Sequence, residues 1–288
     1  MKNTIILIIL SMFFSACLTK PLEVTIPQQE QKTVVFSQVI PGRIMIVALT
    51  KSFGALELQQ DEGDSVSTNF LDKLLEDNAE VTISYDGNTD TLFRIEKGLY
   101  ASVNTPQNAN IIYDLKILNE RGEEVKASGY MLPKIDFTAV TPSIEKGKDT
   151  TTTIQYSFTD IPNTDNWYMI NFYRQGQNLQ GVDVNNIFSN GQNNLVRTEI
   201  ISDATFNGTY EGESKFNGFE LGANDTIAVA ISNINEDYFK FLDLRQRGGN
   251  IFSELTREPI SYPTNVKNGY GFFNTHYPDI KIFDLNDY

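Results

Sequence analysis

Residues 79–95 read AEVTISYDGNTDTLFRI. Two runs rich in β-branched and aromatic residues, 79–85 and 91–95, flank the dipeptide Asp86-Gly87. Asp-Gly suits the two-residue turns of β-hairpins, whose central residues need positive φ angles. We therefore expect two antiparallel strands here, in a fold of short strands joined by tight turns.

The same pattern extends along the chain on both sides of this hairpin. In the first half the expected strands are 33–40, 43–50, 79–85, 91–95, 100–103, 111–118 and 123–131. Apolar residues at helical spacing within 68–77 predict a short helix that covers one end of the sheets. Short strands at this spacing, over about 100 residues, match an immunoglobulin-sized β-sandwich.

A second set of strands follows a polar, proline-containing stretch at 133–148, where we place the domain boundary. These strands are expected at 150–158, 167–174, 182–184, 195–201, 209–216 and 226–232. Trp167 begins one of them, and in a sandwich domain we expect its ring to pack between the sheets.

One helix is expected after these strands, with Asn235 as its N-cap and Gly248-Gly249 as its end. The predicted fold class is therefore mainly β. It consists of two immunoglobulin-like β-sandwich domains, 33–133 and 134–288, with two short helices.

The N-terminus has the features of an export signal. Lys2 is followed by an apolar run over 5–14, and the only Cys of the chain is Cys17. The run is too short to span roughly 30 Å of hydrocarbon but suits the apolar region of a signal peptide. We therefore expect a signal peptide over residues 1–16.

Residues 14–17 read FSAC, which resembles a bacterial lipobox, in which the Cys is acylated and becomes the mature N-terminus. We accordingly expect lipidation of Cys17, a tether over 17–32 and attachment to a membrane through the lipid anchor. Leu18 after the Cys fits sorting to the outer membrane, while the membrane face stays open. The alternative is a simple secretory signal with an incidental Cys.

The charge and the Cys and His counts exclude several classes of protein. The chain has 23 Lys and Arg against 37 Asp and Glu, a formal charge of −14. A nucleic-acid binder needs a clustered basic surface, so we expect no nucleic-acid partner. One Cys forms no internal disulfide, and one His excludes a centre built on two or more histidines. We predict no metal and no cofactor.

Asp86, Asn88 and Asp90 have the spacing of the first ligands of a calcium loop. However, Thr91 stands where that loop needs Gly, and Lys97 stands where it needs a bidentate Glu. A hairpin turn is therefore the preferred interpretation.

A second polar loop could supply a weak calcium site, although a solvated turn is preferred; its oxygens come from Asp160, Asn163, Asp165 and Asn166. His276, the single His, has no Gly-x-Ser-x-Gly motif to accompany it, so a Ser/His triad is not expected. We predict no catalytic residues and no enzyme activity.

An aromatic cluster lies near the C-terminus, beside Gly269 and Gly271; its members are Tyr270, Phe272, Phe273 and Tyr277. These rings could form a sugar-stacking or protein-docking face. The alternative, which we favour, is a closing strand whose rings fill the second core while the glycines relieve crowding.

Taken in order, the chain's motifs resemble one known family. They are the lipobox, the Asp86-Gly87 turn, Gly98-Leu99-Tyr100, Tyr113-Asp114-Leu115, Met131-Leu132-Pro133, the 202–208 segment, the helix containing Tyr238, the 258–265 segment and Asn268 to Phe273. This order resembles the lipoproteins of domain-of-unknown-function 4249, typically encoded beside TonB-dependent outer-membrane receptors.

The resemblance implies a lipoprotein of the outer membrane that acts as a non-catalytic accessory binding or assembly subunit. Its expected partner is an outer-membrane β-barrel protein, a TonB-dependent transporter. The family supplies no established catalytic residues. Two alternatives remain open, a surface module that binds glycan or peptide and, less favoured, a hydrolase with clustered polar groups in a pocket.

Four triplets resemble the Asp-Ser/Thr acceptor motif of envelope O-glycosylation in bacteria that carry this family. Their acceptors are Ser65, Thr91, Thr150 and Thr226, each directly after an Asp. Composition predicts roughly one such triplet by chance, so we predict glycosylation at these positions.

Overall fold

A computed structural model describes six stretches of the chain, residues 30–40, 44–52, 74–147, 150–175, 195–248 and 262–288. The expected signal peptide, most of the tether, Cys17 and Ser65 lie outside these stretches. Most of the helix expected at 68–77 and the strand expected at 182–184 also lie outside them. Among the described residues, none of the helices combines the length and the apolar character needed to cross a bilayer.

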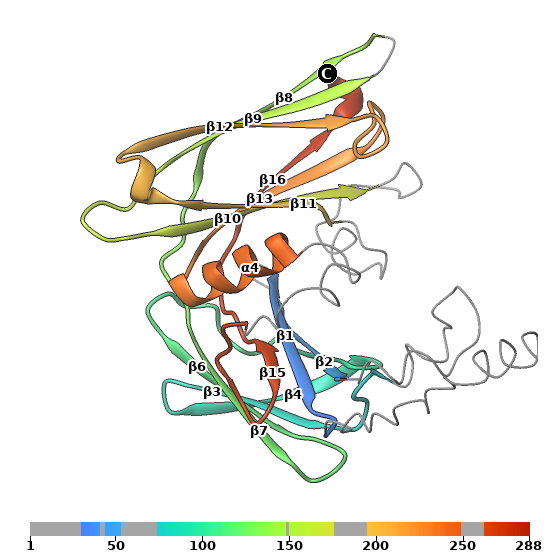
Figure 1. The fold of residues 1–288 in the computed structure, drawn as a ribbon, viewed down its shortest axis with the longest axis vertical. Helices are drawn as coiled ribbons and strands as arrows, with labels where there is room; N and C mark the ends of the chain where they lie inside the picture. The colour runs from blue at the N-terminus through green and yellow to red at the C-terminus, as the bar shows by residue number, and fades with distance from the viewer. Residues whose placement is uncertain (1–29, 41–43, 53–73, 148–149, 176–194, 249–261) are drawn as a thin grey trace, which may run out of the picture. The chain divides into compact units, whose positions relative to one another are not determined.

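The first half of the chain and the C-terminal segment 266–272 together form a nine-stranded, nearly closed sheet in the order β14-β7-β6-β3-β4-β5-β2-β1-β15 (Figure 1). Its strands are β1 (Thr33–Ile40), β2 (Ile44–Lys51), β3 (Glu80–Tyr85), β4 (Asn88–Glu96), β5 (Leu99–Ser102), β6 (Ile112–Leu118), β7 (Glu124–Tyr130), β14 (Val266–Lys267) and β15 (Tyr270–Phe272). Exposed and buried residues alternate strictly along β6, as expected for a sheet with one face on a core. The expected strands of this half agree with β1 to β7 to within a few residues.

One short segment forms both ends of this sheet. Val266 of β14 pairs with Ala127 of β7, while Phe272 of β15 pairs with Phe36 of β1. The two-sheet sandwich expected for residues 33–133 is therefore wrong. Antiparallel pairing continues from strand to strand through the whole first half, and the C-terminal segment joins its two edges.

The second half forms two smaller sheets. β12 (Thr209–Asn217), β9 (Thr151–Thr159) and β8 (Phe137–Glu145) make a three-stranded sheet, and β11 (Leu195–Ser202), β10 (Trp167–Gln175), β13 (Thr226–Ile234) and β16 (Asp279–Asp284) make a four-stranded one. Short 3-10 helices follow at Asp203–Thr205 and Leu285–Asp287. Both sheets contribute to one core, whose largest fully buried rings include Phe158, Tyr168, Phe172 and Phe216. A sandwich is therefore present in this half. The stretch 133–148, expected as a boundary, contains β8.

Helix α4 (Glu236–Gly248) begins at the expected cap, where Asn235 Oδ1 accepts a hydrogen bond of 2.9 Å from the Tyr238 N–H. Phe241 and Leu242 of this helix share a third cluster with Phe272 of β15. Trp167 packs on this cluster and not between the sheets, because its neighbour Tyr168 occupies the inward-facing position on β10.

Candidate functional site

The C-terminal aromatic residues divide between cores and surface. Phe273 is fully buried in the core of the nine-stranded sheet, and Phe272 is 3% exposed in the α4 cluster. Tyr277 is partly buried, and only Tyr270 is well exposed, at 44%, with the Lys32 ammonium 5.3 Å from its ring centre. The four residues therefore do not form the single docking face considered as a possibility from the sequence, because successive side chains of an extended segment point to opposite sides.

His276 lies in a buried polar segment with Asn274 and Thr275 and not in an open site. Its Nδ1 is 2.8 Å from the Asn274 amide nitrogen, and burial lowers the pKa of His276 to about 4. The Ser37 hydroxyl donates to the Asn274 carbonyl and accepts from its N–H, at 2.6 and 2.7 Å. Ser37 thus ties this segment to β1 and is not a nucleophile activated by His276.

This burial predicts a pH-dependent stability. An exposed His in the unfolded chain binds a proton below pH 6.5, whereas the folded His276 binds one only near pH 4. Stability from this group is therefore complete above pH 6.5 and falls by about 3 kcal/mol as the pH drops to about 4. Urea unfolding between pH 4 and 7 should show this loss for the wild type and a flatter profile for His276→Gln. Equal profiles for the two proteins would contradict the assignment.

In each of the two polar loops considered as calcium sites, one carboxylate forms internal hydrogen bonds. Asp86 and Gly87 have φ angles of 44° and 76° and form the expected hairpin turn. The Asp90 carboxylate accepts hydrogen bonds from the Ser102 and Thr105 hydroxyls. In the second loop, Asp160 accepts from the Tyr168 hydroxyl. Within the described stretches, no group of three or more His, Cys, Asp or Glu residues could hold a metal ion.

Three of the four predicted glycosylation acceptors lie in described stretches. Thr91 is exposed in the middle of β4, opposite Thr82. Thr150 lies directly before β9, and Thr226 is the first residue of β13. Modification of these residues stays a prediction.

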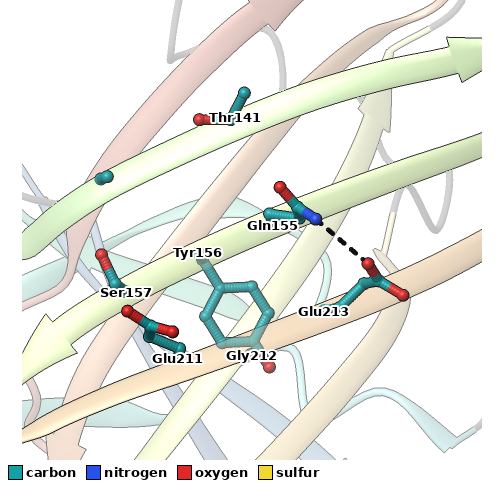
Figure 2. Close-up of a pocket in the computed structure, with 8 residues that line it drawn as sticks. Thr141, Gln155, Tyr156, Ser157, Glu211, Gly212 and Glu213 are labelled. Atoms are coloured by element: carbon teal, nitrogen blue, oxygen red, sulfur yellow. Dashed lines mark hydrogen bonds between the residues drawn. The ribbon is translucent and has the colours of Figure 1, made fainter.

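The outer face of the three-stranded sheet carries an open hollow of about 450 Å³ (Figure 2). Thr141, Gln155 and Glu213 lie side by side across β8, β9 and β12, and the Gln155 amide donates to Glu213 at 3.2 Å. A hydrogen bond from Lys215 lowers the pKa of Glu213, which makes this carboxyl a poor proton donor near neutral pH. The hollow therefore suits hydrogen bonding better than acid catalysis.

A carboxylate that sequence analysis did not single out lies between the two small sheets. Glu199 of β11 accepts hydrogen bonds from the Tyr156 hydroxyl at 2.6 Å and from the Ser214 hydroxyl at 2.5 Å. Burial raises the pKa of Tyr156 well above its usual value, and the hydrogen bond to Glu199 raises it further. Opposite Tyr156 is Gly212, where a Cβ atom would lie 2.4 Å from the ring. These contacts hold the sandwich together and leave no free nucleophile among them.

A patch of apolar side chains lies on the outside of the nine-stranded sheet. Phe93 and Ile95 of β4 are 52% and 49% exposed, and Val103, directly after β5, is 55% exposed. Ala101 of β5, opposite Phe93, is fully buried, and Ile46 of β2, opposite Ala101, is only partly exposed. We call the three exposed residues Phe93, Ile95 and Val103 the β4 patch. Exposed apolar patches of this kind commonly mark interaction surfaces.

These features define a mainly β protein with a nearly closed nine-stranded sheet and a small sandwich. The chain belongs to the family of domain-of-unknown-function 4249 (DUF4249), which it matches over residues 19–278. The family expected from the ordered motifs is thereby confirmed. No curated protein matches the chain.

One similar solved structure is the trypsin-activated alpha-2-macroglobulin from Escherichia coli. It shares 12% identity with this chain at a TM-score of 0.23, over 75% of this chain and 15% of that one. The chain thus spans a small part of that protein's length, and so low a score supports no conclusion about function.

Proposed function

We propose that this protein is a lipid-anchored, non-catalytic accessory subunit of an outer-membrane β-barrel protein, with a TonB-dependent transporter as its partner. The signal peptide over 1–16 and the lipobox Cys17 supply the export and the anchor in this proposal. The partner in this proposal is the one implied by the resemblance of the ordered motifs to the DUF4249 lipoproteins.

The observation that carries the proposal is the β4 patch. Phe93, Ile95 and Val103 leave about half of each side chain in water, which costs free energy that a bound partner would recover. Large aromatic anchors such as Phe93 provide most of the binding energy in protein interfaces. A hydrolase is less well supported. A general acid needs a raised pKa to stay protonated near neutral pH, whereas the pKa of Glu213 in the hollow of Figure 2 is lowered.

The test is purification of the full chain from its native host in mild detergent. We expect one outer-membrane β-barrel protein to accompany the wild type in stoichiometric amount. Cys17→Ser should leave the washed membranes, because a hydroxyl cannot take the thioether-linked lipid. Retention of that variant in the membranes would contradict the anchor.

The β4 patch is tested in the same preparation by Phe93→Asp. This substitution should weaken binding of the β-barrel partner by about ten-fold or more. Phe219→Asp is the matched control, because Phe219 is a single ring, 95% exposed, in the turn between β12 and β13. Recovery of the wild type without any β-barrel protein, or equal effects of the two substitutions, would defeat the proposal.

A further inference from the structure

A second hollow, of about 560 Å³, lies at one end of the nine-stranded sheet. It is formed where the turn between β3 and β4 meets the start of β6 and the end of β7. This volume lies in the range of small-molecule sites in proteins. None of the residues predicted from the sequence as lipidation, docking or glycosylation sites lines it.

The floor of this hollow is apolar. Ile112 of β6 and Tyr130 of β7 lie directly opposite each other and are 55% and 41% exposed. The Tyr130 hydroxyl donates to Asn110 Oδ1 at 3.0 Å, which fixes the edge of the ring. The pair therefore presents exposed apolar surface, including one face of an aromatic ring, to the hollow.

The rim of the hollow is polar and includes groups that have no partner. Asp114 lies two residues from Ile112 on the same face of β6, opposite Ser84 of β3. Throughout the part of the chain that the structure describes, no hydrogen bond or ion pair engages the Asp114 side chain, so both of its oxygens can accept. The Asn110 amide nitrogen likewise remains available as a donor beside Tyr130.

The rim is held in place before any ligand arrives. The Asn110 N–H donates to the Met131 carbonyl at 2.7 Å, and the Met131 N–H donates to the Ile111 carbonyl at 3.0 Å. The buried Tyr113 donates to the Pro106 carbonyl at 2.7 Å and so anchors the preceding loop. A site whose polar groups are already ordered loses less entropy on binding.

The charges of the lining select the class of ligand. Asp86 and Asp114 line the hollow, and no Lys or Arg does. The nearest cation along β6, Lys116, bonds to Glu124 at 2.8 Å. Phosphates and carboxylates would therefore be repelled. A ligand with one apolar face and a ring of hydroxyl groups matches both the floor and the rim.

We propose that this hollow binds a neutral carbohydrate. One sugar ring lies with its C–H face against Tyr130 and Ile112, donates hydroxyl protons to Asp114 and accepts from the Asn110 amide. A cationic peptide could also pair with Asp114 through its ammonium groups, so it is the competing ligand that the test below must exclude. This site goes beyond the proposed subunit role, and binding is measured on the purified protein without any barrel, so the two proposals fail independently.

The test uses the full chain in detergent and a panel of neutral tetrasaccharides built from glucose, xylose, mannose or N-acetylglucosamine. Ligand-observed NMR identifies the binders, and calorimetry measures their affinity. We expect at least one to bind, and both Tyr130→Ala and Asp114→Asn to weaken it about ten-fold or more. Because Asp114 is exposed and unpaired, its variant should unfold at the wild-type temperature.

Tyr270→Ala is the matched control, because this tyrosine is similarly exposed, at 44%, but lies on β15. It should leave the affinity unchanged. Three results would overturn the proposal: no tetrasaccharide binds the wild type, a binder keeps its affinity in both hollow variants, or tetralysine binds in an Asp114-dependent manner while the sugars do not.

Discussion

Replacement of Gly271 by alanine is expected to destabilise the protein by about 3–5 kcal/mol. Gly271 has a φ angle of +89°, and a Cβ atom built on it would lie 2.1 Å from the Val35 carbonyl oxygen. Alanine would therefore be strained in its backbone and would also push β15 away from β1. Urea unfolding of the wild type and the variant measures the loss.

Gly87→Ala provides the control for backbone strain alone. Gly87 also has a positive φ angle, +76°, but nothing lies within 4 Å of the position of its Cβ atom. Its substitution should cost only about 1 kcal/mol. Equal losses for the two variants would show that the close approach of β15 to β1 contributes nothing to stability.

The difference between Gly271→Ala and Gly87→Ala measures how much the pairing of β15 with β1 stabilises the nine-stranded sheet. β15 lies beside β1 in Figure 1, and Val35 pairs with Gly271 in parallel register. The adjoining Asn268 donates its side-chain amide to the Glu124 carbonyl of β7 at 3.1 Å. A seven-residue segment, 266–272, therefore satisfies backbone groups on both edges of the sheet, which would otherwise be open to pairing with other chains.

The strands of the first half could be predicted because their signals are local. Alternating apolar residues and an Asp-Gly turn fix β3 and β4 without any knowledge of the rest of the chain. The closure could not be predicted in this way, since β14 and β15 are too short for a periodic pattern and β15 pairs with a strand more than 200 residues away. β8 was missed because Pro142 favours a linker, although proline is tolerated in an edge strand such as this one.

The surfaces were harder to predict than the strands. The β4 patch combines two residues of β4 with one that follows β5, and the hollow at Tyr130 combines residues of four strands, so both surfaces depend on the register between strands. A shift of one residue would turn Tyr130 to the core, and no single stretch of sequence records that register. His276 and Phe273 were open to a functional interpretation for the same reason, and the fold places both in buried positions.

Phe273→Ala is expected to lower stability by about 3–5 kcal/mol, the usual cost of removing a large buried ring. Phe273 is fully buried in the core of the nine-stranded sheet. Its backbone is fixed as well, because the Asn265 side chain accepts from its N–H at 2.9 Å and donates to its carbonyl at 2.7 Å. The cavity cannot close easily around a segment held in this way. Urea unfolding measures the loss.

Tyr270→Ala separates this core role from a docking role. Tyr270 lies three residues away and is 44% exposed, so its loss should cost less than about 1 kcal/mol. If the C-terminal aromatics only close the sheet, Phe273→Ala should weaken every binding activity in proportion to the unfolded fraction, and Tyr270→Ala should weaken none. Selective loss of the co-purified barrel partner in Tyr270→Ala, at full stability, would instead place the docking surface on β15 and argue against the β4 patch.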